Sequence, residues 1–192
     1  MTTDRYSDFA EDLEVAVTED GTVVEPTTLE VLTATFGAKI VATHTNHGDA
    51  TALVDAKAFL EVMQWLRDER GFALCSSVTG YDDLGKEPRF YAVYHLVNVT
   101  DPERIRVKVG LPEKKPVVDS VTGLYPGANF MEREAYDLLG IEFKGHPDLR
   151  RIMMPEEWEG HPLRRDYPHV YEPVQFTHNA AEIAKRKPFA KS

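Results

Sequence analysis

Three carboxylates within one short stretch, Glu132, Glu134 and Asp137, are the side chains of this sequence that could most readily bind a metal ion. A di-metal site built on helices needs a Glu-x-x-His pair that faces inward from each of two helices. The next histidine along the chain is His146, and a glycine that would end a helix lies before it. We therefore interpret the three carboxylates as a salt-bridged helix surface rather than as metal ligands.

The histidines and the single cysteine do not form a recognisable catalytic set. His44 and His47 lie in a loop-like segment, where surface histidines are the default. His146 and His161 each precede a proline, which favours extended backbone and suits a polar contact better than a general base held by a rigid neighbour. Cys75 lies in an apolar strand pattern, which indicates a small buried hydrophobe rather than a nucleophile.

Composition excludes several classes of protein. The chain has 192 residues, of which 42% are apolar and 28% charged, as in a soluble globular protein. Its formal net charge of −10, without a basic cluster, argues against nucleic-acid binding. With Cys75 as its one cysteine, the chain alone can form neither a disulfide nor an Fe–S site. We see no secretory signal and no run of apolar residues that could span a bilayer, so we expect membrane contact only through partners.

The elements that must position these residues follow from local signals. Thr27 and Glu30 form a capping box that opens a helix, and Asp55 is expected to cap a second helix. Strands are expected at residues 39–43, 51–54, 72–78, 89–99 and 104–109. The last of these strands alternates charged and apolar residues, as a strand with one face in water does. Together, the expected helices and strands predict an α+β fold, with a small, mostly antiparallel sheet and helices packed on one side.

Residues 119–140 are expected to be helical in two pieces, interrupted at residues 125–127. In the second piece, residues 128–139, the apolar side chains gather on one side at helical spacing. Arg133 and Asp137 fall on the opposite side, four residues apart, where they are expected to form an exposed ion pair.

Charge and proline content divide the chain into three parts. Residues 1–70 carry 14 acidic and 5 basic side chains, and we interpret residues 1–25 as an acidic, partly disordered leader; a docking tail for a basic partner is the alternative. Residues 26–144 are the globular domain. Residues 145–192 hold six of the twelve prolines together with many aromatic residues and arginines. We expect an extended tail that docks on a partner, although packing on its own domain remains the alternative.

Three runs in the second half of the chain carry a specific resemblance. They are EREAYDLLGI from Glu132, GHPDLRR from Gly145, and MPEEWEGHPLRRDYP from Met154. Together they closely resemble the signature of the 30-kilodalton subunit of NADH:quinone oxidoreductase (respiratory complex I). The resemblance is strongest over residues 119–168 and looser over residues 38–110.

This resemblance implies a non-catalytic scaffold and assembly subunit in the quinone module of the peripheral arm. The complex transfers electrons from NADH to quinone and couples this to ion translocation. The chain would pack against the hydrogenase-like large subunit of the complex, on the cytoplasmic face of a bacterial membrane. It would carry no cofactor itself, and FMN, Fe–S clusters and quinone would bind in partner subunits. The alternatives are a homologous scaffold subunit of a membrane-bound hydrogenase or other quinone-linked dehydrogenase, and an independent soluble enzyme.

The resemblance also implies a set of interface residues. Arg133 and Asp137 would hold the geometry of an exposed helix face, and Trp158 and Leu163 would be apolar anchors. The arginines that would pair with carboxylates or carbonyls of the hydrogenase-like large subunit are Arg150, Arg151, Arg164 and Arg165. The full predicted interface is Glu132, Arg133, Glu134, Asp137, His146, Arg150, Arg151, Trp158, His161, Leu163, Arg164, Arg165, Asp166 and Tyr167.

Overall fold

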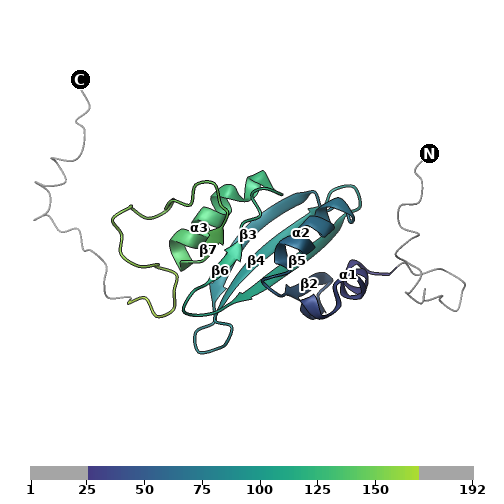
Figure 1. The fold of residues 1–192 in the computed structure, drawn as a ribbon, viewed down its shortest axis with the longest axis horizontal. Helices are drawn as coiled ribbons and strands as arrows, with labels where there is room; N and C mark the ends of the chain where they lie inside the picture. Colours follow the sequence, from purple (N-terminus) through teal and green to yellow (C-terminus); the bar gives the residue numbers. More distant parts are fainter. Residues whose placement is uncertain (1–25, 169–192) are drawn as a thin grey trace, which may run out of the picture.

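The computed structural model describes residues 26–168 (Figure 1). The expected acidic leader and the part of the tail beyond residue 168 lie outside the described residues. The helices are α1 (Thr28–Phe36), α2 (Phe59–Asp68) and α3 (Asn129–Leu139), with 3₁₀ turns at Gly37–Lys39 and Pro126–Ala128. The strands are β1 (Ile40–Asn46), β2 (Asp49–Val54), β3 (Leu74–Asp82), β4 (Phe90–Asn98), β5 (Glu103–Leu111), β6 (Val117–Asp119) and β7 (Glu142–Lys144).

Five strands form one sheet in the order β1-β2-β5-β4-β3, and β6 pairs with β7 in a second, two-stranded sheet. In the large sheet the β2–β5 pair is parallel and the other three pairs are antiparallel. This arrangement confirms the predicted α+β fold with a mostly antiparallel sheet. It also brings β3, which follows α2 in the chain, to the far edge of the sheet beside α3 (Figure 1).

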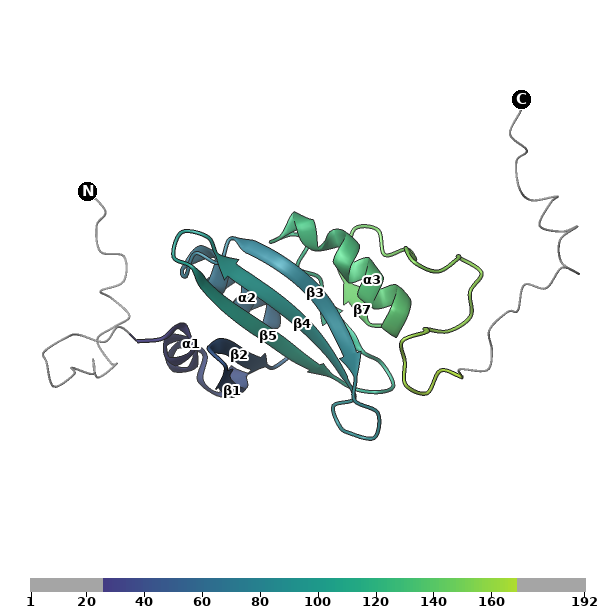
Figure 2. The ribbon, with the colours of Figure 1, turned by 180° about the vertical axis from the view of Figure 1, so that it is seen from behind.

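One face of the sheet is the core face. On β5 the apolar residues Ile105, Val107 and Val109 are buried, and the charged residues between them point to the other face. α2 covers the core face with Phe59, Val62, Met63 and Leu66, all fully buried. Seen from behind, the sheet lies in front of α2 and no helix crosses its second face (Figure 2). The strict alternation read from the β5 sequence therefore matches the structure.

Most of the predicted elements are present, with three corrections. The capping box of Thr27 and Glu30 is formed as expected. Asp55 does not cap α2: Ala58 is the N-cap, and the Asp55 carboxylate accepts the N–H of Lys57 in the turn before the helix. His44 lies in β1, because that strand continues to Asn46, although His47 is in the following turn as expected.

The third correction concerns residues 119–124, the first of the two expected helical pieces, which are not helical. Val117–Asp119 is strand β6, and a turn leads to the short 3₁₀ helix Pro126–Ala128 before α3. The turn is held by the Glu132 carboxylate, which accepts hydrogen bonds from the Ser120 hydroxyl and the Val121 N–H. A side chain from the next helix thus satisfies backbone that a helix would have paired internally. Within residues 26–168, no helix is long and apolar enough to cross a bilayer.

Candidate functional site

The signature segment folds around Asp137, whose side chain is fully buried on α3. Its Oδ2 accepts the backbone N–H groups of Ile152, Met153 and Met154 at 3.0, 2.7 and 2.8 Å. Its Oδ1 accepts a 2.6 Å charge-assisted bond from Arg151. Burial alone would raise the pKa of Asp137, but the Met154 N–H, the Arg151 guanidinium and the two other N–H groups outweigh it and lower the pKa. The carboxylate is therefore a charged anchor for residues 150–154.

Arg151 extends this anchor to the next loop. Its Nη2 donates to the carbonyl oxygens of Trp158 at 2.8 Å and Gly160 at 3.0 Å. Arg133 lies on the same helix as Asp137 and donates to the carbonyls of Arg150 and Arg151. The predicted exposed pair of Arg133 and Asp137 is therefore wrong. Arg133 and Asp137 each bind segment 145–168 instead of one another. This segment covers the helix and buries Asp137.

Segment 145–168 also caps the C-terminus of α3. The last four carbonyls of a helix have no partner within it. Here the His161 ring pairs with the carbonyl of Asp137 at 2.8 Å, and the N–H of Leu163 donates to Leu138 at 2.9 Å. Arg164 donates from Nε to the carbonyl of Leu139 at 2.6 Å. Its positive charge also lies at the negative end of the helix dipole.

A second anchor joins the segment to the sheet through Arg89, which is 4% exposed. Its guanidinium binds Asp82 through two 2.8 Å hydrogen bonds and pairs with Glu113 at 2.6 Å and Asp166 at 2.9 Å. The Asp82 carboxylate also accepts the N–H of Arg165 at 2.9 Å. The Arg89 guanidinium is the main cause of the lowered pKa of Asp82. Of these residues only Arg165 and Asp166 belong to the predicted interface. Asp82 and Arg89 flank the β3–β4 turn, and the closeness of two opposite charges in the sequence is the signal from which their ion pair could have been predicted.

Glu132 is a core residue, which corrects the prediction of a salt-bridged surface. Its side chain is fully buried, with Oε1 accepting the Val121 N–H at 2.8 Å and Oε2 the Ser120 hydroxyl at 2.6 Å. Burial raises the pKa of Glu132 to about 7, and the two hydrogen bonds offset only part of that rise. Cys75 is buried, as predicted, and burial raises the pKa of its thiol to about 12. A thiol with that pKa remains protonated at neutral pH and is a poor nucleophile.

The other predicted interface residues take varied places. Glu134 is exposed, and His146 pairs with the carbonyl of Asn129 at 3.2 Å. Arg150 is exposed and binds Asp148, and Trp158 is half-buried. Tyr167 packs beside Gly160. The predicted pairing of Arg151 and Arg164 with a partner is replaced here by bonds within the chain, whereas the Arg165 side chain makes no hydrogen bond or ion pair with any described residue.

Residues 145–168 pack on their own domain, which was the alternative to an extended tail, and docking of this segment on a partner stays a prediction. The physical reason for this packing is that α3 offers the segment a buried carboxylate and the three carbonyls of Asp137, Leu138 and Leu139. Across residues 26–168, no three His, Cys, Asp or Glu side chains converge on a point that could hold a metal ion.

The same region presents large apolar side chains to solvent. Phe130, Ile152, Met153 and Leu163 are 63%, 40%, 63% and 59% exposed, respectively. We call these four residues the α3-tail surface. Their backbone is fixed by the bonds just described, so the surface is held in place rather than carried on an unattached loop. Exposed apolar groups on a fixed scaffold are typical of protein interfaces.

Comparison with known proteins bears directly on this region. Residues 52–173 match the family model described as the 30 kDa subunit of respiratory-chain NADH dehydrogenase. A subunit of NADH-quinone oxidoreductase from Roseiflexus sp. (strain RS-1) is 48% identical over 167 residues, which cover 86% of this chain and 96% of that protein. The corresponding protein of Geobacter metallireducens is 43% identical over 134 residues, or 69% of this chain and 83% of that protein.

Two solved structures are similar as well. A trypsin-resistant fragment of Nqo5 is 36% identical, with a TM-score of 0.53, and the match covers 56% of this chain and 89% of the fragment. A chain of the archaeal membrane-bound sulfane sulfur reductase has a TM-score of 0.64 over 85% of this chain and 94% of its own length. It is 20% identical, so that likeness shows a shared fold alone.

Proposed function

The chain belongs to the family of the 30 kDa subunit of respiratory-chain NADH dehydrogenase, and we propose that it is the scaffold and assembly subunit of the quinone module in the peripheral arm. As part of NADH-quinone oxidoreductase, it serves electron transfer from NADH to quinone in the respiratory chain. In this proposal the chain supplies binding surface, and FMN, Fe–S clusters and quinone are held by partner subunits. Cys75 supports this assignment, because it is buried, its thiol has a raised pKa, and an Fe–S cluster needs several cysteine thiolates.

The observation that carries the proposal is the fixed α3-tail surface. The residues that hold it, Asp137, Arg151 and Arg164, lie in the runs that carry the family resemblance. Their side chains are occupied in bonding the segment to α3, so their contribution to assembly is to preorganise the surface. A preorganised surface binds a partner at a lower entropic cost than a segment that must order on binding.

We assign the hydrogenase-like large subunit as the partner on the α3-tail surface. The chain would then reach the cytoplasmic face of the membrane through the assembled complex. Among the arginines of residues 145–168, Arg165 is exposed beside this surface and has its side chain available for a carboxylate of that partner. Phe130 and Met153, the two most exposed members of the surface, would be its apolar anchors.

The test is affinity purification of the tagged chain from its native membranes in a mild detergent. We expect the unaltered chain to recover the hydrogenase-like large subunit, the flavin- and Fe–S-bearing subunits, and NADH:quinone activity. Met153→Glu should lower recovery of the large subunit at least tenfold, because an apolar interface does not solvate a carboxylate. Val41→Glu, at a residue that is 61% exposed on β1, is the matched control and should behave as the unaltered chain does.

Two outcomes would contradict the proposal. Equal recovery with Met153→Glu and Val41→Glu would show that the hydrogenase-like large subunit binds elsewhere on the chain. Recovery of the subunits of a hydrogenase complex in place of the NADH-oxidising ones would keep a scaffold role but assign another complex.

A further inference from the structure

The open face of the five-stranded sheet carries a basic row. Arg104, Arg106 and Lys108 alternate along β5 with buried apolar residues, so all three point away from α2. No helix covers this face in the part of the chain that the structure describes (Figure 2). On this face of β1 to β5, Asp49 is the one acidic side chain. The chain as a whole has a formal charge of −10, so the row stands out against its acidic background.

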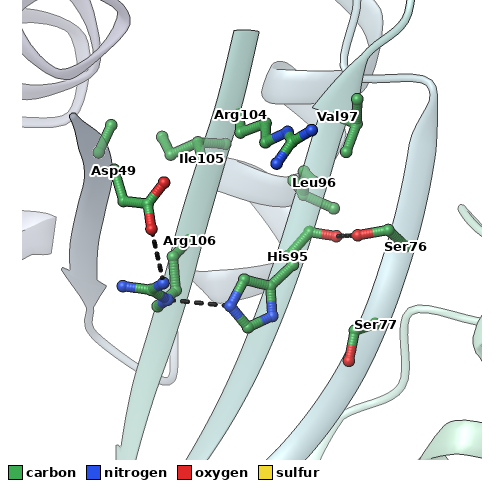
Figure 3. A pocket seen from close by; sticks show the side chains of 10 residues that line it. Asp49, Ser76, Ser77, His95, Leu96, Val97, Arg104, Ile105 and Arg106 are labelled. Carbon is green, nitrogen blue, oxygen red and sulfur yellow. Dashed lines mark hydrogen bonds and ion pairs between the residues drawn. The ribbon is translucent and has the colours of Figure 1, made fainter. Parts of the chain in front are cut away.

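The row borders a cavity of about 330 Å³. Figure 3 shows Arg106 between Asp49 and His95: its Nε donates to His95 Nε2 at 2.9 Å, and its Nη2 pairs with Asp49 at 3.2 Å. Arg104 and Ser77 line the same cavity. The Arg104 side chain is exposed and makes no hydrogen bond or ion pair within the described residues. It is thus a cation available to a ligand.

His95 adds an unpaired donor to the cavity. Because its Nε2 accepts from Arg106, the ring proton of the neutral imidazole lies on Nδ1. The Nδ1 atom is buried and has no partner among the described residues. A buried N–H without an acceptor is costly, and an oxygen atom entering the cavity would supply the acceptor after a small shift of the ring. Arg104, Arg106 and His95 together therefore present donors to a single anionic group.

Apolar and aromatic side chains flank the basic row. Tyr81 and Tyr91 stack with their ring centroids 4.7 Å apart, and Lys108 lies over the Tyr81 ring at 5.6 Å. Leu74, beside Val97 on the neighbouring strand, is 47% exposed. A face of arginine, tyrosine and exposed aliphatic groups has the composition of a protein interface rather than of a solvated sheet face.

We propose that this open face binds an acidic segment of another protein subunit, with an aspartate or glutamate side chain inserted between Arg104, Arg106 and His95. The inference rests on the proposed function, because that partner would be a second member of the same complex, distinct from the one on the α3-tail surface. Three cations on a chain of charge −10 are too few for a polyanion such as nucleic acid, and they suit one or two carboxylates. The flanking tyrosines and Leu74 would pack against the peptide that carries the carboxylates.

Zero-length cross-linking of the affinity-purified complex tests the inference and identifies the partner. A water-soluble carbodiimide joins the Lys108 amine to a carboxylate that touches it, and the water lost in forming the amide converts the reagent to its urea. Peptide mass spectrometry then names both ends of the link. We expect Lys108 joined to an aspartate or glutamate of a different subunit, and we expect Lys108→Arg, which keeps the charge, to remove that link alone.

Charge reversal supplies the second measurement. Arg104→Glu should lower retention of the cross-linked partner at least fivefold at moderate salt, with an unchanged unfolding midpoint, because the Arg104 side chain makes no hydrogen bond or ion pair within the described residues. Lys57→Glu, at an exposed position before α2 on the other side of the sheet, is the matched control and should retain that partner.

A link from Lys108 only to the chain's own residues 1–25 would overturn the inference and make that acidic segment the occupant. So would a recovered complex without any Lys108 link, or one with equal retention in Arg104→Glu and Lys57→Glu. These results can be distinguished from a failure of the proposed function. In that case, affinity purification of the unaltered chain would recover no other component of NADH-quinone oxidoreductase.

Discussion

At the scale of single residues, two buried carboxylates of α3 have opposite electrostatic surroundings. Asp137 accepts three backbone N–H groups and a guanidinium, and its pKa is lowered despite burial. Glu132 accepts one N–H and one hydroxyl, and its pKa rises to about 7. Donor number and charge decide the sign of the shift, because both side chains are fully buried. Asp137 is therefore an ionic anchor, and Glu132 keeps its proton to a higher pH than an ordinary glutamate does.

Asp137→Asn should destabilise the protein by about 2–4 kcal/mol, because the amide NH₂ would face groups that are themselves donors. Hydrogen exchange at residues 150–160 should accelerate as the loop loses its anchor. Urea unfolding and exchange mass spectrometry would measure both effects. Glu134→Gln, on the exposed face of the same helix, is the control, and an equal change in both variants would refute the anchor role.

The raised pKa of Glu132 predicts a pH dependence of stability. Between its ordinary value of 4.5 and about 7, the unfolded chain releases the proton while the folded chain keeps it, so this residue's contribution to stability falls as pH rises. Glu132→Gln should remove that dependence. Between pH 4 and pH 8, the free energy of unfolding should fall by roughly 1–3 kcal/mol more in the unaltered protein than in the variant. Unfolding free energies measured across this range check it, and parallel curves for the two proteins would contradict it.

At the scale of elements, the end of α3 depends on segment 145–168. Gly140 follows the helix with φ of 73°, and a Cβ there would meet the His161 ring at 2.6 Å and the Arg164 guanidinium. Close packing at this glycine lets His161, Leu163 and Arg164 reach the last carbonyls of α3. The local sequence supplies one bond of the cap, from the Gly140 N–H to the carbonyl of Tyr136, and residues more than twenty positions away supply the bonds to the last three carbonyls.

Gly140→Ala tests this cap against a control with the same backbone. Gly145 also has a positive φ, of 84°, but nothing lies within 4 Å of its Cβ position. We expect Gly145→Ala to cost about 1–2 kcal/mol for backbone strain alone. Gly140→Ala should cost at least about 1 kcal/mol more and increase hydrogen exchange in residues 161–164. Equal costs for the two variants, measured by urea unfolding, would show that the crowding at Gly140 is relieved without loss of the cap.

At the scale of the whole molecule, segment 145–168 joins α3 to the sheet. It is tied to the helix through Asp137 and to the β3–β4 hairpin through Asp82, Arg89 and Asp166. The sequence alone predicts that truncation after Gly145 leaves a folded domain that no longer joins the complex. The structure adds that this domain would lack both ties and the α3 cap.

Truncation after Gly145 should therefore keep the five-stranded sheet but lower the unfolding free energy by about 2–5 kcal/mol. It should also abolish recovery of the hydrogenase-like large subunit in the affinity purification, because the backbone that carries Ile152, Met153 and Leu163 is gone. Circular dichroism with urea measures the first effect and mass spectrometry the second. If the truncated chain has the same free energy of unfolding as the unaltered chain, segment 145–168 contributes nothing to the stability of the domain.

The sequence by itself determined the features that depend on nearby residues. The capping box of Thr27 and Glu30, the alternation along β5 and the periodicity of α3 are local patterns, and the structure reproduces them. These patterns were sufficient to predict the α+β fold. The long signature from Glu132 to Pro168 was sufficient to identify the family, since it occurs as a nearly continuous run.

Only the tertiary structure decided what covers each helix face and which charges are paired. Helical spacing placed Asp137 opposite the apolar stripe, which suggested an exposed side chain, but segment 145–168 encloses it. Arg89 meets Asp166, and Arg165 meets Asp82, across separations of about 80 residues that no local pattern encodes. Burial and ion pairing depend on the chain path as a whole. For that reason the anchors of segment 145–168 and the cavity of the open sheet face became visible only in the folded protein.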